Sequence, residues 1–188
     1  MKTTNILYIH GFNSGPGKKV ETIKETGFNC FCPQLKNNPK EDLQTLKDCI
    51  QKENIHQVVA TSFGGYYGLI LAQEFTDLKY HLINTSYKPY ETLKIFLNTK
   101  VKNYKNREEF FVDAIYLKKL KKIKPNLSII SKDSIYFYFG TQDEVLNFDE
   151  LIKEITIKLN SKNIYKEDQD HRFQDIKIVL TKIKTFIK

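Results

Sequence analysis

The sequence predicts one α/β domain, built on a mostly parallel sheet of about six strands with helices on both faces. Two observations support this fold class. Short β-branched or aromatic runs alternate along the chain with stretches whose apolar residues recur at helical spacing. The chain has 188 residues, which suits a single domain (residues 1–188) with a sizeable core.

The expected strands are short and apolar, and most are followed by a turn or a helical stretch. They are residues 5–10, 28–32, 56–61, 80–84, 134–139 and 163–166. The expected helices carry apolar side chains at offsets of three and four. They are residues 39–52, 63–75, 89–97, 107–123, 148–159 and 173–187. Strand 5–10 is expected to lie between strands 28–32 and 56–61.

Residues 88–124 depart from this alternation, because they contain two expected helices and no expected strand. A short helical insertion between two strands of the sheet would look like this, and such insertions often cover a site. The segment holds 11 basic and 4 acidic residues, a net charge of +7 out of +8 for the whole chain. It could steer an anionic ligand, an acidic surface or nucleic acid, although a solvated face in a lysine-rich protein is the simpler interpretation.

Ser62 is the residue that points most directly to chemistry. It lies in residues 60–64 (ATSFG), between an expected strand and an expected helix. This is the context of a nucleophile elbow, in which small residues around the serine relieve crowding at a sharp turn. The turn also puts the backbone N–H of Phe63 at a helix N-terminus, where it can donate to an oxyanion. An ordinary strand–helix turn could have the same composition.

The loop after the first expected strand, residues 10–17 (HGFNSGPG), supplies a second feature. Gly11 permits a sharp turn, and the backbone N–H of Phe12 is the expected second donor to the oxyanion. A phosphate-binding loop is the alternative, but its spacing would require glycine at position 12 and serine or threonine at position 19. Phe12 and Lys19 occupy those positions.

A nucleophilic serine needs a base, and the base needs a group that orients it. His171 lies between the last expected strand and the last expected helix, and Asp143 follows the strongest expected strand. Glu144 and Asp149 are weaker candidates for the acid. Taken singly, Asp143 and His171 are more typical of a turn and a surface loop. In the order Ser62, Asp143, His171 they match a serine triad on this kind of sheet, so we expect all three to be catalytic.

Several segments of the chain resemble the YqiA/YcfP-type small bacterial esterases, a group of compact α/β-hydrolases. They are residues 8–14 (YIHGFNS), 62–67 (SFGGYY), 82–84 (LIN) with 88–91 (KPYE), 140–146 (GTQDEVL) and 171–173 (HRF), and they recur in order over most of the chain. The group usually has glycine where this chain has Ala60. The resemblance implies an esterase acting on short acyl esters or thioesters, with Ser62, Asp143 and His171 as its triad.

The sequence therefore predicts a serine hydrolase that forms an acyl-enzyme on Ser62. Gly11, Tyr66 and Tyr87 are expected to line the substrate site, although tyrosines in such positions serve as often in the core. The alternative from another class is a non-catalytic binding protein with the hydrolase fold, which would use the basic residues 88–124 to bind an acidic partner.

The sequence shows no sign of a membrane span, a signal peptide, a disulfide framework or a cofactor site. No apolar run approaches the roughly 18 residues of a membrane span, and residues 1–9 are too short and too soon followed by polar residues for a signal peptide. Cys30, Cys32 and Cys49 fit no disulfide framework or zinc pair, so we expect reduced thiols and a cytoplasmic protein. The chain carries no nucleic-acid-binding signature. The mechanism calls for no metal or organic cofactor, and the expected partner is a small-molecule ester or thioester.

Overall fold

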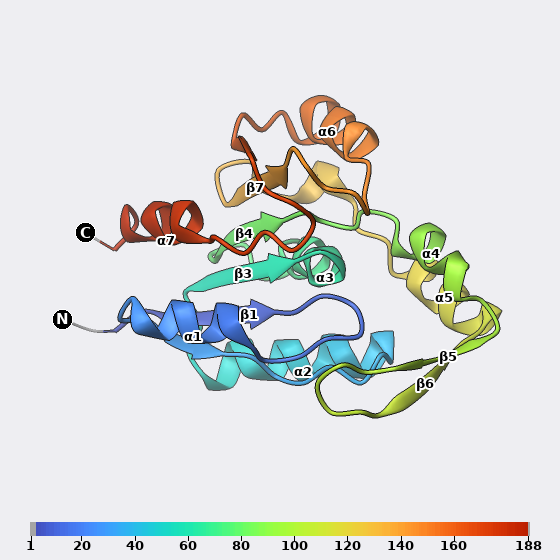
Figure 1. The fold of residues 1–188 in the computed structure, drawn as a ribbon. Helices are drawn as coiled ribbons and strands as arrows, with labels where there is room; N and C mark the ends of the chain where they lie inside the picture. Colours follow the sequence, from blue (N-terminus) through green and yellow to red (C-terminus); the bar gives the residue numbers. More distant parts are fainter. Residues whose placement is uncertain (1–2, 188) are drawn as a thin grey trace.

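The computed structural model describes residues 3–187, and a six-stranded sheet forms its centre (Figure 1). The strands are β1 (Asn5–Ile9), β2 (Asn29–Phe31), β3 (Gln57–Thr61), β4 (Lys79–Ile83), β7 (Ile135–Gly140) and β8 (Ile164–Glu167). Their order is β2-β1-β3-β4-β7-β8, and all neighbours run parallel. The expected position of β1 between β2 and β3 is confirmed.

Alternate side chains of each strand enter two apolar layers, one on each face of the sheet. From β1, Ile6 and Tyr8 pack with α1 (Lys18–Glu25) and α7 (Lys177–Lys184). Leu7 and Ile9 join the layer on the other face. The helices of that layer are α2 (Pro39–Lys52), α3 (Phe63–Leu71), α5 (Ala114–Lys122) and α6 (Asp149–Glu154), which continues into the π-helical turn η3 (Ile155–Leu159). Helices therefore cover both faces, as predicted.

The insertion at residues 88–124 differs from the prediction, because it contains a β-hairpin between its helices. It is built from α4 (Pro89–Thr92), the 3₁₀ turn η1 (Leu93–Phe96), and the antiparallel strands β5 (Thr99–Lys102) and β6 (Glu109–Val112), followed by α5. The expected helix over 107–123 is wrong in its first half. There Phe110 is half-buried, Phe111 is exposed and Val112 is buried, which is the alternation of a strand. Helix α5 begins only after Asp113, whose Oδ1 accepts the backbone N–H of Tyr116 as an N-cap.

Two other helices are shorter than predicted. Helix α3 ends at Leu71. Helix α7 begins at Lys177, and Phe173, where the predicted helix was to begin, has a positive φ of 44° that no helix contains. A further 3₁₀ turn, η2 (Leu127–Ile129), precedes β7. Cys30, Cys32 and Cys49 form no disulfide in the structure. Over residues 3–187, no helix combines the length and apolar character that crossing a membrane requires.

Candidate active site

Ser62 stands at the sharp turn between β3 and α3, and its backbone has φ 52° and ψ −119°. Such a conformation is strained for any residue except glycine, and strain of this kind is often found at functional sites. The turn requires glycine at position 64, because a Cβ there would lie 2.3 Å from the carbonyl oxygen of Ile9 and 2.7 Å from that of His10. The sterics of a nucleophile elbow are therefore present in the backbone itself.

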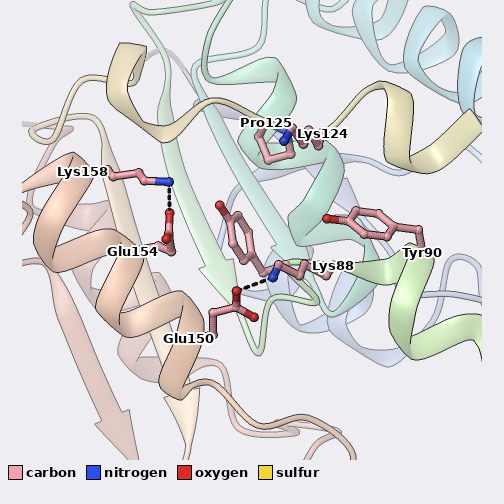
Figure 2. Close-up of a pocket in the computed structure, with 8 residues that line it drawn as sticks. Lys88, Tyr90, Lys124, Pro125, Glu150, Glu154 and Lys158 are labelled. Atoms are coloured by element: carbon pink, nitrogen blue, oxygen red, sulfur yellow. Dashed lines mark hydrogen bonds and ion pairs between the residues drawn. The ribbon is translucent and has the colours of Figure 1, made fainter. Parts of the chain in front are cut away.

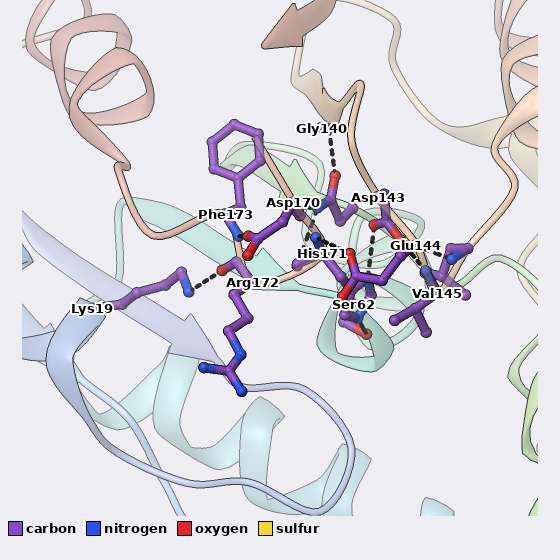
Figure 3. Close-up of polar contacts among 12 residues, drawn as sticks. Lys19, Ser62, Gly140, Asp143, Glu144, Val145, Asp170, His171, Arg172 and Phe173 are labelled. Atoms are coloured by element: carbon purple, nitrogen blue, oxygen red, sulfur yellow. Dashed lines mark hydrogen bonds and ion pairs between the residues drawn. The ribbon is translucent and has the colours of Figure 1, made fainter. Parts of the chain in front are cut away.

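The three side chains predicted as a triad meet at the carboxyl end of the sheet (Figure 3). His171 Nε2 lies 3.1 Å from Ser62 Oγ, and His171 Nδ1 lies 2.7 Å from Asp143 Oδ2. The Asp143 side chain is 1% exposed and that of His171 is 19% exposed, so the carboxylate is sealed while the ring is reachable. This arrangement can pass a proton from the serine hydroxyl to the ring while the carboxylate orients the ring.

The orientation of Asp143 is fixed by its second carboxylate oxygen. Oδ1 accepts hydrogen bonds from the backbone N–H groups of Val145 and Leu146, both at 2.8 Å, which leaves Oδ2 for the histidine. The neighbouring carboxylate of Glu144 instead accepts the backbone N–H of His171 at 3.2 Å. Glu144 thus holds the backbone of the histidine loop, and the acid in contact with the ring is Asp143.

The loop after β1 brings the expected oxyanion donors to the serine. Phe12 and Phe63 both line the cavity at Ser62, and within residues 3–187 neither backbone N–H has a hydrogen-bond partner. Gly11 lies beside the serine, and a Cβ on it would be in ordinary van der Waals contact with Ser62, 3.8 Å from Oγ. Both amides therefore lack a partner within the described residues and lie in residues that line the cavity, which keeps them as candidate oxyanion donors.

His10 holds this loop in shape. Its Nδ1–H donates to the carbonyl oxygen of Gly11 at 2.9 Å, and its Nε2 accepts the backbone N–H of Leu35 at 3.2 Å. Only a neutral imidazole can make both contacts. Burial lowers the pKa of His10, which favours that neutral form.

A cavity of about 640 Å³ opens at Ser62 and His171. Much of its lining is apolar and comes from the insertion and the loop of the acid: Pro89, Leu93, Ile95, Phe96, Tyr104, Val145 and Leu146. Three cations, Lys18, Lys19 and Arg172, also line it. The site therefore offers both an apolar wall and positive charge beside the serine.

The insertion is attached to the loop after β1, which carries Phe12, by aromatic packing. The ring of Phe12 lies 5.6 Å from that of Phe96 and 5.4 Å, edge-on, from that of Phe110. Among the described residues, no basic side chain of 88–124 lines the cavity at Ser62. This apolar contribution was not predicted from the sequence, because only the folded chain shows which side of the lysine-rich segment faces the cavity.

Two predicted substrate contacts are not at this cavity. Tyr66 is fully buried in α3, and its hydroxyl donates to the carbonyl oxygen of Leu120 at 2.7 Å, so it is a core residue. Tyr87 lines a separate cavity of about 200 Å³, which is crossed by the Lys88–Glu150 ion pair and also contains the Lys158–Glu154 pair (Figure 2). Of the three predicted lining residues, only Gly11 lies at Ser62.

Residues 3–187 contain no cluster of three or more His, Cys, Asp or Glu side chains arranged to hold a metal ion. The functional groups that meet at this site are the hydroxyl of Ser62, the imidazole of His171 and the carboxylate of Asp143.

Comparison with known proteins agrees with this fold. A family model described as "Uncharacterised protein family (UPF0227)" matches residues 5–188. Among solved structures, the alpha/beta hydrolase domain-containing protein 10 from mouse is 14% identical, with a TM-score of 0.68 over 99% of this chain and 90% of that one. Est1E from Butyrivibrio proteoclasticus is 15% identical, with a TM-score of 0.66 over 99% of this chain and 87% of that one. At these identities the two structures show that the chain has the α/β-hydrolase fold.

Proposed function

The chain belongs to the uncharacterised protein family UPF0227, and we propose that it is a serine hydrolase that cleaves short acyl esters or thioesters. Its membership confirms the resemblance to the YqiA/YcfP-type group. The observation that carries the proposal is the hydrogen-bonded chain from Ser62 Oγ through the His171 ring to Asp143.

In the proposed mechanism, Ser62 Oγ attacks the carbonyl carbon of the ester while His171 Nε2 takes the hydroxyl proton. Asp143 holds the ring in the tautomer that leaves Nε2 free to accept. The developing oxyanion is stabilised by the backbone N–H groups of Phe12 and Phe63, and one such donor is typically worth about 3–4 kcal/mol.

Collapse of the tetrahedral intermediate breaks the bond to the leaving group, which departs with the proton from His171. An acyl ester on Ser62 remains. Water, deprotonated by the same ring, then attacks the acyl carbon, and the carboxylic acid leaves as the serine hydroxyl is restored. Both halves use the same pair of backbone donors.

The lining of the cavity supports an acyl substrate. The apolar residues Leu93, Ile95 and Phe96 can pack along a short hydrocarbon chain whose carbonyl carbon lies at Ser62 Oγ. Lys18 and Arg172 can attract a leaving group that carries negative charge, such as a phosphorylated thiol. Turnover of an anionic thioester should then fall as salt is raised, whereas turnover of a neutral ester should not.

A fluorophosphonate probe tests the nucleophile directly. We expect the wild-type protein to be labelled, Ser62→Ala to be unlabelled, and Ser128→Ala, which removes an exposed hydroxyl on η2, to be labelled like the wild type. A panel of p-nitrophenyl esters of increasing acyl length, matched thioesters and matched amides then identifies the substrate class.

A folded wild-type protein that takes no label and turns over nothing in this panel would exclude the hydrolase. That outcome would favour the alternative of a binding protein that uses residues 88–124. Turnover of the amides at the rate of the esters would keep the triad but change the substrate class.

A further inference from the structure

The segments that carry Ser62, Asp143 and His171 are all attached to residues 83–86, the last residue of β4 and the chain that follows it. On the side of the nucleophile, the backbone N–H of Ser62 donates to the carbonyl oxygen of Ile83 at 2.9 Å. The backbone N–H of Ser86 donates to the carbonyl oxygen of Ser62 at 3.1 Å. The turn that carries the nucleophile is therefore bonded to this segment through both of its own backbone groups.

The side chain of Asn84 connects the other two catalytic segments. Its Oδ1 accepts the backbone N–H of Gly140 at 2.7 Å, three residues before Asp143 (Figure 3). Its Nδ2 donates to the carbonyl oxygens of Asp170 at 3.0 Å and His171 at 3.1 Å. One amide group thus joins the end of the strand that leads to the acid to the loop that carries the base.

The environment of Asn84 leaves this amide a single useful orientation. The residue is 1% exposed, and its φ of 44° is a conformation that asparagine adopts more readily than most residues. A buried amide without partners is costly, and here the oxygen and both donor contacts are satisfied. The surroundings consist of one donor and two acceptors, which match an amide and do not match a carboxylate.

We propose that Asn84 is a positioning residue for the hydrolysis proposed above, on which this inference rests. By setting the distance between Gly140 and the histidine loop, Asn84 fixes where the His171 ring lies relative to Ser62 Oγ and Asp143. Asn84 does not line the cavity at Ser62. Its loss should therefore lower kcat and leave KM nearly unchanged, because reacting groups are displaced while substrate contacts stay.

Asn163 provides a matched control, because it makes the same kind of contact at the opposite end of the sheet. Its Nδ2 donates to the carbonyl oxygens of Lys132 at 3.1 Å and Ile135 at 3.2 Å, at the start of β7. Changing asparagine to aspartate at either position turns a donor that faces two carbonyl oxygens into a carboxylate oxygen. Only at position 84 are these carbonyls part of a catalytic segment.

The experiment compares Asn84→Asp and Asn163→Asp with the wild-type protein by thermal unfolding, by kcat and KM on the best ester, and by proton NMR. The proton that His171 Nδ1 shares with Asp143 should give a far-downfield resonance in the wild type, assigned by its loss in His171→Ala. We expect Asn84→Asp to lower kcat roughly 10- to 100-fold and to shift or remove this resonance. Asn163→Asp should keep both kcat and the resonance, even where its thermal midpoint falls.

A folded Asn84→Asp protein with wild-type kcat and an unmoved resonance would overturn the proposal. So would equal losses of kcat in the two variants, since these would indicate a merely structural role. If Asn84→Asp does not fold, Asn84→Gly accommodates the positive φ and removes the same contacts, and the same outcomes apply to it. The resonance is observed without substrate, so a protein that hydrolyses no ester fails the proposed function while the role of Asn84 is still decided.

Discussion

Replacing Gly64 with alanine tests whether the sharp turn at Ser62 is what places the nucleophile. Gly64 lies two residues after the serine, in the first turn of α3. An added Cβ would lie 2.3 Å from the carbonyl oxygen of Ile9 and 2.7 Å from that of His10. Both contacts are with backbone atoms of the β1 strand and its following loop, so no side-chain rotation can relieve them.

The size of the effect follows from these distances. An ordinary contact begins at 3.4 Å, so the methyl group and the Ile9 oxygen must separate by about 1 Å. Overpacking of this kind typically costs about 1–3 kcal/mol of stability. A displacement of about 1 Å near a reacting group can lower the rate about 100-fold. We therefore expect Gly64→Ala to lose stability and to lose roughly 100-fold in kcat.

Gly68→Ala is the matched control, because it makes the same change one turn later on α3. Its Cβ would lie 2.7 Å from Cδ2 of Leu82, the end of a side chain that can rotate. Helix propensity favours alanine by up to about 1 kcal/mol, which offsets part of that contact. Urea unfolding and steady-state kinetics on one ester measure both variants. If Gly64→Ala matched Gly68→Ala in stability and kcat, the steric account of the turn would be refuted.

Three further predictions concern the acid, a buried carboxyl and the apolar wall. Asp143→Asn should lower kcat about 10³- to 10⁴-fold. The new amide oxygen would keep the hydrogen bonds from the two backbone N–H groups, so its NH₂ would donate to His171 Nδ1 and leave the ring proton on Nε2, which then cannot accept the proton of Ser62. A loss of less than tenfold in kcat would contradict this. Burial raises the pKa of Asp42 to about 6, above its unfolded value of about 4. The free energy of unfolding should therefore be highest below pH 4 and should fall as the pH rises through 6, by about 3 kcal/mol more than in Asp42→Asn. Urea unfolding at pH 4 and pH 7 checks this, with exposed Asp48→Asn as the control, and parallel pH profiles for the wild type and Asp42→Asn would exclude the effect. Ile95 lines the cavity and is 79% exposed, so Ile95→Ser should leave the thermal midpoint unchanged. It should lower kcat/KM more for longer acyl esters than for acetate esters, and an equal change for all acyl lengths would show that Ile95 does not contact the acyl chain.

Much of the fold could be predicted from local patterns. The four inner strands of the main sheet, β1, β3, β4 and β7, are short runs that are buried on both faces, whereas the edge strands β2 and β8 are partly exposed. The predicted boundaries of all six strands agree with the structure to within a residue or two. The hairpin in the insertion was not predicted, because β6 exists only through its pairing with β5. Phe110 and Phe111 suit a helix face or a strand equally well by sequence, and tertiary pairing decides between them.

Some residues of the candidate site could also be predicted from the sequence, and others could not. Ser62, Asp143 and His171 were predictable because each follows a strand of the parallel sheet, and the carboxyl ends of such strands share one edge. Tyr66 and Tyr87 were misplaced because their sequence position does not reveal which side of α3 or of the β4 loop they face. Asn84 was predicted only as the last residue of the strand 80–84 and as part of the segment 82–84 of the resemblance, because the sequence does not show which backbone groups its amide contacts.

The sequence by itself determined the alternation of strands and helices, the order of the three catalytic candidates and the small residues around the serine, because these depend on short-range sterics and periodicity. Tertiary structure alone decided that groups 109 residues apart lie 3.1 Å from each other, and that one buried amide joins the loops of the acid and the base. Such distances result from how the sheet, its helices and its loops pack together, and no local pattern encodes that packing.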